Sequence, residues 1–287
     1  MSKALIVTAD DFGRSLPVND AVMDAHANGI LTAASLMVTE AALDDAVARA
    51  KALPSLGVGL HMTLVDGIPA LPPAQIPDLV DSQGHFTLDL VRLGASIFLR
   101  KSVQKQVIAE MRAQFEAFKA TGLKLAHVDS HHHYHLHPTV FELMLDLALE
   151  YGVPGIRIPW EPPFLSWQAR RDRMGARLFN GMFHWRRSER MRKLASEAGL
   201  VVNDVAFGLN DSGAMTADKV GSFLEVLPDG LSEIYSHPAT RHWETRPMPP
   251  QYQVEGEYKA FTDPANRAKV KDLGIRLTTF AAEGKRP

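Results

Sequence analysis

Six of the twelve histidines in this chain lie between His127 and Pro138, beside the carboxylate of Asp129. Dense histidines next to a carboxylate are typical of a metal site, because neutral imidazole is the commonest metal ligand in proteins. The alternatives are ordinary core or exposed histidines, or an expression tag. A tag does not fit, because the tract is internal and its flanks are well patterned. One ion cannot bind six imidazoles, so we expect most of them to be structural or to contact the ligands or the substrate.

Two other segments could complete such a site. Asp10 and Asp11 follow the apolar run 4–9, and His61 lies near the end of the apolar run 57–62. Asp11, His61 and one histidine of the tract would form a two-histidine, one-carboxylate site with open positions. An ion held there would act as a Lewis acid on a carbonyl and lower the pKa of a water. Taken singly, His61 could be a satisfied core histidine and the aspartates a helix N-cap, so the interpretation rests on the joint pattern.

Two residues could move protons at this site. Asp10 is a candidate general base for the water, and His237, after the apolar run 231–235, is a candidate acid for the leaving group. Adjacent strand residues point to opposite faces, so Asp10 and Asp11 can serve one site only where the strand ends and the backbone turns. The following Phe12 and Gly13 allow such a turn.

The elements that must position these residues alternate along the whole chain. Apolar runs of strand type are followed by amphipathic helical patterns, which predicts a parallel sheet with helical crossovers. Seven or eight such units favour a (β/α) barrel-like single α/β domain, similar to a TIM barrel, over an open doubly wound sheet. The predicted strands are 4–9, 33–38, 57–62, 124–128, 155–158, 201–207, 231–235 and 275–280. The predicted helices include 17–28, 41–53, 103–118, one opened by Pro138, 215–227 and 263–273, and a Pro-rich excursion covers 67–78.

The candidate residues fall at the carboxyl ends of these strands, which is where a (β/α) barrel carries its active site. They are Asp10, Asp11, His61, His131, Arg157 and His237. Chance could put a few polar residues at strand ends, but much less readily two carboxylates, three histidines and an arginine beside apolar strand interiors. Arg157 there could orient Asp10 or bind a substrate oxygen, and the alternative is a surface ion pair.

The composition restricts the class of protein. With 46% hydrophobic residues, the chain can bury a substantial core as one domain, 1–287. The net charge of −2 and the lack of a basic patch with interleaved aromatics argue against nucleic-acid binding. The absence of cysteine removes disulfides, thiolate nucleophiles and cysteine-ligated zinc, and fits a reducing compartment. The N-terminal apolar run is too short for a signal peptide and no apolar run reaches about 18 residues, so we expect a cytoplasmic protein.

Three motifs in this order resemble the YdjC-like (ChbG-type) carbohydrate deacetylase family. They are Ala9-Asp10-Asp11-Phe12-Gly13, Gly59-Leu60-His61, and His127-Val128-Asp129-Ser130-His131-His132-His133 with His135 and Pro138. The resemblance implies a barrel-like fold and removal of an N-acetyl group from an amino sugar with one divalent ion, Mg²⁺ or Zn²⁺. It implies Asp11, His61 and His131 as ligands. If His131 is not the ligand from the tract, His132 and His133 are the next candidates. It implies Asp10 as the base, and Ser236-His237-Pro238 fits His237 as the acid. We expect Arg157, Asp129 and His133 to orient these groups or bind the substrate.

A basic, aromatic helical insertion at about 160–199 departs from the chito-oligosaccharide enzymes of that family. The whole sequence is closer to the hopanoid-biosynthesis-associated (HpnK-like) branch, which implies an N-acetylglucosaminyl hopanoid glycolipid as substrate. Arginines and aromatic residues alternate from Trp167 to Lys193, as in helices that lie on a membrane surface, and Leu90 to Lys101 is a second such candidate. We therefore expect a peripheral contact at the inner face of the membrane. The alternative is two ordinary barrel helices with arginines on the solvated side.

Other functions stay open at this stage. One is deacetylation of soluble chito-oligosaccharides. Another is a non-catalytic metal-binding protein, which would use the histidine tract but leave Asp10, His61 and His237 unexplained. A metal-dependent phosphoesterase is less suitable, because there is no Gly-rich phosphate loop and a single carboxylate pair is too few ligands for two metals. The sequence leaves open whether the chain forms a homodimer.

Overall fold

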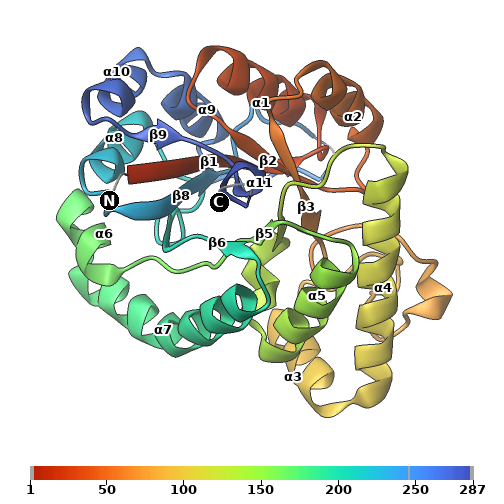
Figure 1. Ribbon diagram of the computed structural model, residues 1–287. Coiled ribbons are helices and arrows are strands. Elements are labelled where there is room, and N and C mark those ends of the chain that lie inside the picture. Colours follow the sequence, from red (N-terminus) through yellow and green to blue (C-terminus); the bar gives the residue numbers. More distant parts are fainter. Residues whose placement is uncertain (1–2, 245, 285–287) are drawn as a thin grey trace.

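The fold is taken from a computed structural model that describes residues 3–244 and 246–284. Within these ranges, helices surround a sheet of parallel strands (Figure 1). The strands are β1 (Lys3–Phe12), β2 (Ala33–Leu36), β3 (Gly57–Met62), β4 (Val128–Ser130), β5 (Gly155–Ile156), β6 (Val201–Val202), β7 (Val205–Phe207), β8 (Gly230–Ser236) and β9 (Arg276–Leu277). The α-helices are α1 (Leu16–Asn28), α2 (Leu43–Ala52), α3 (Leu90–Leu99), α4 (Lys101–Ala120), α5 (Pro138–Glu150), α6 (Pro163–Arg170), α7 (Met174–Glu197), α8 (Ala217–Glu225), α9 (Val254–Thr262), α10 (Pro264–Asp272) and α11 (Phe280–Glu283). Two short 3-10 helices, η1 (Pro73–Gln75) and η2 (His131–Leu136), complete them.

The strands of the sheet lie in the order β6-β5-β4-β3-β2-β1-β8-β7, and β9 pairs separately with β1. The two end strands, β6 and β7, are separated in sequence only by Asn203 and Asp204. The sheet must therefore curl round on itself, because its two ends belong to neighbouring stretches of chain. This confirms the expected (β/α) barrel-like single domain.

The first strand forms the centre of this sheet because its sequence suits burial on both faces. Residues 4–7 are Ala-Leu-Ile-Val, and all four side chains are buried. Strands of parallel sheets read as continuous apolar runs, since helices cover one face and the core fills the other. β1 pairs in parallel with β2 on one side and β8 on the other, so it can carry functional residues to the middle of the carboxyl-end edge.

Several predicted strands have different bounds in the structure. The predicted strands 33–38 and 155–158 end earlier, at Leu36 and Ile156, so Arg157 follows its strand instead of lying in it. The predicted strand 201–207 is broken into β6 and β7 at Asn203, whose side-chain amide accepts from the N–H of Ile158 and donates to its carbonyl, both at 2.8 Å. These two bonds replace the backbone pairing that a continuous strand would make. The predicted strand 124–128 lies too early, because β4 begins only at Val128.

The end of the chain also differs from prediction. The predicted strand 275–280 is only two residues long as β9, and Phe280 instead begins α11. Phe280 is fully buried with Ile6 and Ala33, so α11 fits against the inside of the curled sheet (Figure 1). The sequence patterns also missed α9, which precedes α10.

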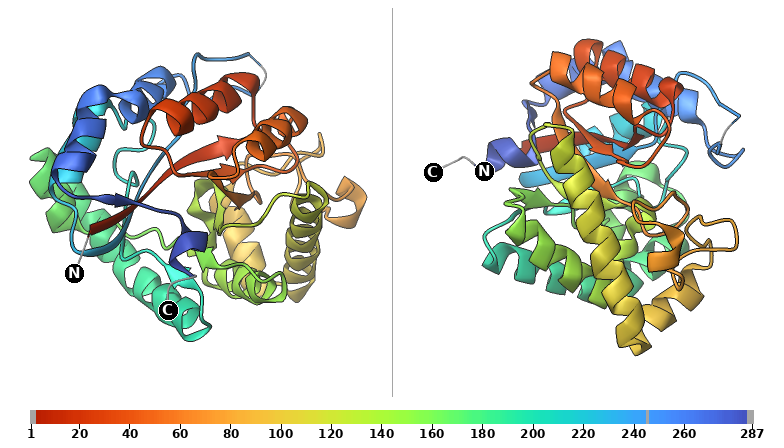
Figure 2. Two further views of the ribbon diagram at one scale, coloured as in Figure 1. Left: turned by 45° about the horizontal axis from the view of Figure 1, so that its top comes forward. Right: turned by 90° about the vertical axis from the view of Figure 1, so that its right-hand side faces the viewer.

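The loops that carry the candidate residues lie on one side of the molecule. In the right-hand view of Figure 2, the segment after β3 and the segment before α9 project on the side opposite to both ends of the described chain. Because all paired strands run parallel, their carboxyl ends meet on that loop side. The arrangement brings together residues that are far apart in sequence.

Candidate active site

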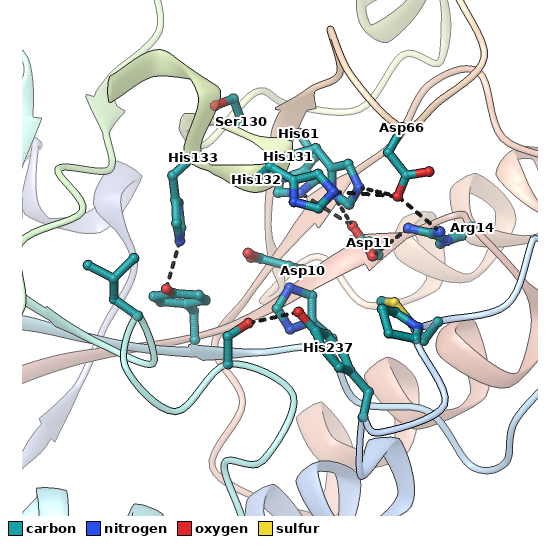
Figure 3. A pocket seen from close by; sticks show the side chains of 16 residues that line it. Asp10, Asp11, Arg14, His61, Asp66, Ser130, His131, His132, His133 and His237 are labelled. Carbon is teal, nitrogen blue, oxygen red and sulfur yellow. Dashed lines mark hydrogen bonds and ion pairs between the residues drawn. The ribbon is translucent and has the colours of Figure 1, made fainter. Parts of the chain in front are cut away.

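An irregular end of β1 brings two adjacent aspartates into one pocket. The pairing of β1 with β2 shifts register between Ala9 and Phe12, and Asp11 has a left-handed backbone with φ of 64°. A bulge of this kind re-aims side chains that would otherwise alternate between the two faces of a strand. Asp10 and Asp11 therefore both line the pocket (Figure 3).

The histidine tract turns sharply as it leaves β4. His132 and His133 both have left-handed backbones, with φ of 54° and 49°, which is uncommon for residues other than glycine and is found at functional sites. As a result, three consecutive imidazoles meet different partners. His131 faces Asp11 and His132 faces Asp66, whereas His133 lies 2.7 Å from the hydroxyl of Tyr235.

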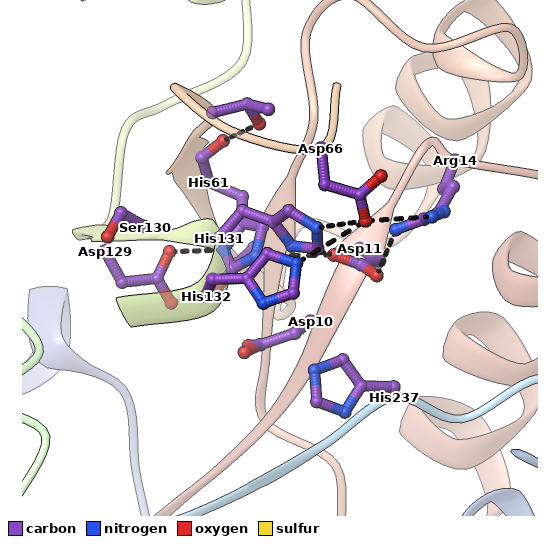
Figure 4. Close-up of polar contacts among 12 residues, drawn as sticks. Asp10, Asp11, Arg14, His61, Asp66, Asp129, Ser130, His131, His132 and His237 are labelled. Carbon is purple, nitrogen blue, oxygen red and sulfur yellow. Dashed lines mark hydrogen bonds and ion pairs between the residues drawn. The ribbon is translucent and has the colours of Figure 1, made fainter. Parts of the chain in front are cut away.

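Asp11, His61 and His131 form a buried group whose donor atoms face one another (Figure 4). Asp11 Oδ1 lies 3.3 Å from His61 Nε2 and 3.1 Å from His131 Nδ1. Both Asp11 Oδ1 and His131 Nδ1 are buried without a hydrogen-bond partner in the described part of the chain. Since buried polar atoms are normally satisfied, these orphaned atoms fit ligands of a cation. Two nitrogens and one oxygen make a donor set typical of Zn²⁺ and related divalent ions.

The charges around this group favour a cation as well. Burial raises the pKa of Asp11, but His131 and Arg14 outweigh it and hold that pKa well below its usual range. Burial lowers the pKa of His61, yet the carboxylates of Asp129, Asp10 and Asp11 outweigh burial and raise that pKa to about 10. The surrounding carboxylates thus stabilise positive charge at the point where the three donor atoms converge.

Asp129 lies behind the group, away from the pocket lining. It is fully buried, and one of its oxygens lies 2.8 Å from His61 Nδ1. Its other oxygen accepts from the hydroxyl of Ser35 at 2.7 Å and pairs with Arg157 at 2.7 Å. The carboxylate fixes the orientation of the His61 ring and leaves Nε2 facing Asp11.

Arg157 follows β5 and is fully buried, so the alternative of a surface ion pair is wrong. Its Nη1 and Nη2 each donate at 2.8 Å to a different carboxylate oxygen of Asp10. The same guanidinium donates to Glu233 and lies over the ring of Tyr235, 4.6 Å from its centroid. A bidentate pair of this kind fixes the plane of the Asp10 carboxylate.

The pocket has a volume of about 210 Å³. His237 reaches it from the end of β8 and lies beside Asp10 (Figures 3 and 4). Its backbone N–H donates to Glu257 at 2.7 Å, and its Nδ1 lies 3.9 Å from the same carboxylate. The structure therefore brings Asp10, Asp11, His61, His131, His133 and His237 to one pocket, while Asp129 and Arg157 lie directly behind it.

The other histidines of the tract have structural surroundings. His127 and His135 are fully buried, and burial lowers the pKa of each to about 4, so both are neutral. His135 lies 3.1 Å from the carbonyl oxygen of Arg157. His137 caps α5 by accepting from the N–H of Val140, and its Nε2 lies 3.0 Å from the Gly94 carbonyl in α3.

Sequence reasoning missed several residues of the site, and four of them contact its predicted members directly. Arg14 donates to Asp11 at 3.1 Å, and its position three residues after Asp11 in a turn was an available signal. Asp66 faces two histidines of the tract, and the Asp-Gly pair at 66–67 gave only a turn signal. Glu233 and Tyr235 point into the curled sheet from β8, and no spacing in the sequence marked them.

Comparisons with known proteins agree with this fold. The model of the YdjC-like protein family matches residues 4–272. A carbohydrate deacetylase of Geobacillus stearothermophilus is 32% identical over 286 residues, covering 98% of each chain. One from Brevibacillus brevis is 42% identical over 180 residues, which are 63% of this chain and 68% of that protein. A crystal structure from Enterococcus faecalis has a TM-score of 0.76 at 24% identity and covers 98% of each chain, so it supports the fold.

The curled parallel sheet with its carboxyl-end pocket places the chain among barrel-like α/β proteins. Within that class, the chain belongs to the YdjC-like protein family.

Proposed function

We propose that this protein is a metal-dependent carbohydrate N-deacetylase. The observation that carries the proposal is the position of Asp10, held bidentately by Arg157, in the same pocket as the Asp11–His61–His131 group. A fixed carboxylate beside a cation site is the arrangement that amide hydrolysis by an activated water needs. The relatives from Geobacillus stearothermophilus and Brevibacillus brevis bear the name carbohydrate deacetylase, which supports the same class of reaction.

Asp11 Oδ1, His61 Nε2 and His131 Nδ1 would hold the ion. Imidazole nitrogens suit Zn²⁺ better than Mg²⁺, whose preferred ligands are oxygens, although the family match alone leaves both open. A divalent ion there would act as a Lewis acid on the amide carbonyl and lower the pKa of a water.

The residues of this chain supply the proton transfers. A water oxygen attacks the amide carbon while Asp10 accepts the proton of that water. The C–N bond then breaks, His237 donates a proton to the departing amine nitrogen, and acetate and a free amino sugar result. Arg157 keeps Asp10 in position, and Asp129 does the same for His61. His133 and Tyr235, paired at 2.7 Å on the pocket wall, would bind the sugar.

For the substrate, we propose a lipid-linked N-acetylglucosaminide, with an N-acetylglucosaminyl hopanoid as the particular case. The support comes from α7. Large apolar side chains in the first half of this helix face outward, whereas a helix that covers a barrel normally turns such side chains toward the core. The inward residues of α7 include Arg177, Gly181 and Ser188. Its exposed residues include five large apolar ones, namely Leu178, Phe179, Met182, Phe183 and Trp185. An ordinary barrel helix would bury these side chains, so they are available to another apolar surface.

The basic residues of this region are mostly engaged within the chain. Arg177 is buried and pairs with Glu161, Asp172 and Asp211. Arg170, Arg173, Arg190, Arg192 and Lys193 also pair with carboxylates. Within the described residues, no carboxylate pairs with Arg171, which lies over the ring of Trp167, or with Arg186 and Arg187, which flank the apolar side chains. Membrane attraction would therefore depend more on the apolar residues of α7 than on the count of arginines.

A second exposed apolar element lies close to the same part of the molecule. Val91, Phe98 and Leu99 of α3 are exposed, and α3 is anchored to the end of the histidine tract through His137 and Tyr134. α7 also contacts η2 and α5, and α3 contacts α5 as well. The helices α3 and α7 therefore both lie beside the histidine tract and the helix that follows it. None of the described helices is both long enough and apolar enough to cross a bilayer. We propose peripheral contact with the inner face of the cytoplasmic membrane, through α3 and α7.

Acetate release tests this function. The purified protein is incubated with an N-acetylglucosaminyl lipid in mixed micelles, with chito-oligosaccharides and with phosphate esters. Release of acetate from the lipid-linked sugar at the highest kcat/KM supports the full proposal. Preference for free chito-oligosaccharides keeps the deacetylase and rejects the glycolipid. Release of phosphate alone, or of neither product while an ion binds, rejects the deacetylase in favour of a phosphoesterase or a non-catalytic metal protein.

A further inference from the structure

Asp66 has an unusual position beside the histidine tract. It lies in the loop after β3, and its Oδ2 is 3.5 Å from His131 Nε2 and 3.4 Å from His132 Nε2. Its backbone is left-handed, with φ of 47°, so the loop holds the residue in a conformation that few side chains adopt. Aspartate and asparagine are among the residues that tolerate this region best.

The two imidazoles of the proposed ion site have the same kind of surroundings. His61 presents Nε2 to Asp11 and has Nδ1 at 2.8 Å from the Asp129 carboxylate. His131 presents Nδ1 to Asp11 and has Nε2 facing the Asp66 carboxylate. A histidine ligand usually donates its second N–H to a carboxylate or carbonyl, which fixes its tautomer and strengthens it as a ligand.

We propose that Asp66 is the positioning residue for His131, as Asp129 is for His61. The proposal rests on the ion site described above. By accepting the proton of His131 Nε2, Asp66 leaves Nδ1 unprotonated and directed at the point where Asp11 and His61 converge.

The two carboxylates differ in what else they contact. Asp129 is fully buried, whereas the Asp66 side chain is 33% exposed and lines the pocket. Arg246, from the segment before α9, donates to the Asp66 backbone carbonyl at 2.9 Å and lies 3.8 Å from its carboxylate. The same arginine pairs with buried Glu40 at 3.3 Å. Asp66 could therefore serve only to anchor this segment, and a test must separate the two roles.

A second cation between Asp66, His131 and His132 is a competing explanation, since their donor atoms also lie within 4.8 Å of one another. The local charge argues against it. Arg14 lies 3.8 Å from Asp66 Oδ2 and Arg246 lies 3.8 Å from Asp66 Oδ1, so two guanidinium groups already neutralise this carboxylate. Another divalent ion there would meet repulsion from both.

The experiment measures Zn²⁺ affinity and stoichiometry by competition with a chromophoric chelator, on protein first freed of metal. Asp66→Asn removes the charge and Asp66→Gly removes the acceptor altogether, and both residues tolerate a left-handed backbone. We expect one equivalent of Zn²⁺ in each protein, with affinity about 10-fold weaker for Asn and up to about 100-fold weaker for Gly. The melting temperature of the metal-free variants should equal that of the metal-free wild type.

Arg246→Gln is the matched control, because it removes the anchor to the segment before α9 and keeps the Asp66 carboxylate. Its Zn²⁺ affinity should stay near wild type. Unchanged affinity in both Asp66 variants, or an equal loss in Arg246→Gln, would overturn the positioning role. So would a second equivalent bound by the wild type and lost in Asp66→Gly. A wild type that binds no Zn²⁺ or Mg²⁺ would instead reject the ion site on which the inference rests.

Discussion

Arg157 donates two parallel hydrogen bonds of 2.8 Å to the carboxylate of Asp10, and neither side chain has more than 2% of its surface exposed. The carboxylate therefore has one orientation in the pocket. Because Arg157 also contacts Asp129 and Glu233, a single guanidinium links the proposed base to the carboxylate behind His61.

We predict that Arg157→Lys lowers kcat while the ion still binds. Lysine keeps the positive charge but cannot hold two carboxylate oxygens in one plane. A displacement of about 1 Å in a reacting group can cost on the order of 10²-fold in rate. Steady-state kinetics with thermal melting check this, and Arg112→Lys, in an exposed pair with Glu150, is the control. Normal kcat in Arg157→Lys would contradict the orienting role.

Asp10→Asn should separate proton transfer from ion binding. The amide keeps an oxygen near Arg157 but cannot accept the proton of the water. Loss of a general base typically costs about 10²–10⁴-fold in rate. We expect turnover to fall in this range with Zn²⁺ affinity unchanged, measured by acetate release and chelator competition on the same preparation. Turnover close to wild type would mean that another group accepts the proton.

Neighbouring histidines of the tract should behave differently. His131→Ala removes an atom 3.1 Å from Asp11 Oδ1 and should abolish tight Zn²⁺ binding. His132→Ala removes a ring that is 41% exposed, faces Asp66 and lies edge-on to the His131 ring, and it should leave one equivalent bound. Metal content after dialysis distinguishes them. A full equivalent in His131→Ala and none in His132→Ala would reverse the assignment of the ligand.

The outward face of α7 predicts binding to lipid surfaces. A variant with Phe179, Met182, Phe183 and Trp185 changed to Ser should lose co-sedimentation with anionic vesicles and keep its activity on a free N-acetylglucosaminide. Among the described residues of this region, Arg171, Arg186 and Arg187 pair with no carboxylate and would add roughly 1 kcal/mol each, so salt should weaken binding only in part. Leu149→Ser with Leu273→Ser, exposed leucines elsewhere, is the control. Equal co-sedimentation of both variants with vesicles would show that the apolar face of α7 does not bind the lipid surface.

The sequence predicted those parts of the site that lie on regular strands. His61 and His237 follow apolar runs, so their positions at the carboxyl-end edge could be read from the pattern. The pairing of Asp10 with Arg157 joins residues 147 positions apart, and only the order of the strands brings them together. The pattern suggested that Arg157 could orient Asp10 but could not exclude a surface ion pair.

Local backbone geometry limited the remaining predictions. The positions of Asp66 and His132 depend on left-handed backbone conformations, one in a loop and one in η2, where the sequence has no hydrophobic periodicity that could predict them. The predicted strand 201–207 reads Val-Val-Asn-Asp-Val-Ala-Phe, and the side-chain bonds of Asn203 to Ile158 lie at the point where it breaks. In α7 the apolar residues were recognised, but their outward direction follows from packing that periodicity does not reveal.

The central claim is that one ion, held by Asp11, His61 and His131, is required for removal of an N-acetyl group. The most direct test is a titration of metal-free protein with Zn²⁺, and separately with Mg²⁺, while acetate release from an N-acetylglucosaminide is measured. We predict no release without metal and a rise that reaches its plateau at one equivalent of the tighter ion. Full acetate release from chelator-treated protein, or no release at any metal concentration, would contradict the claim.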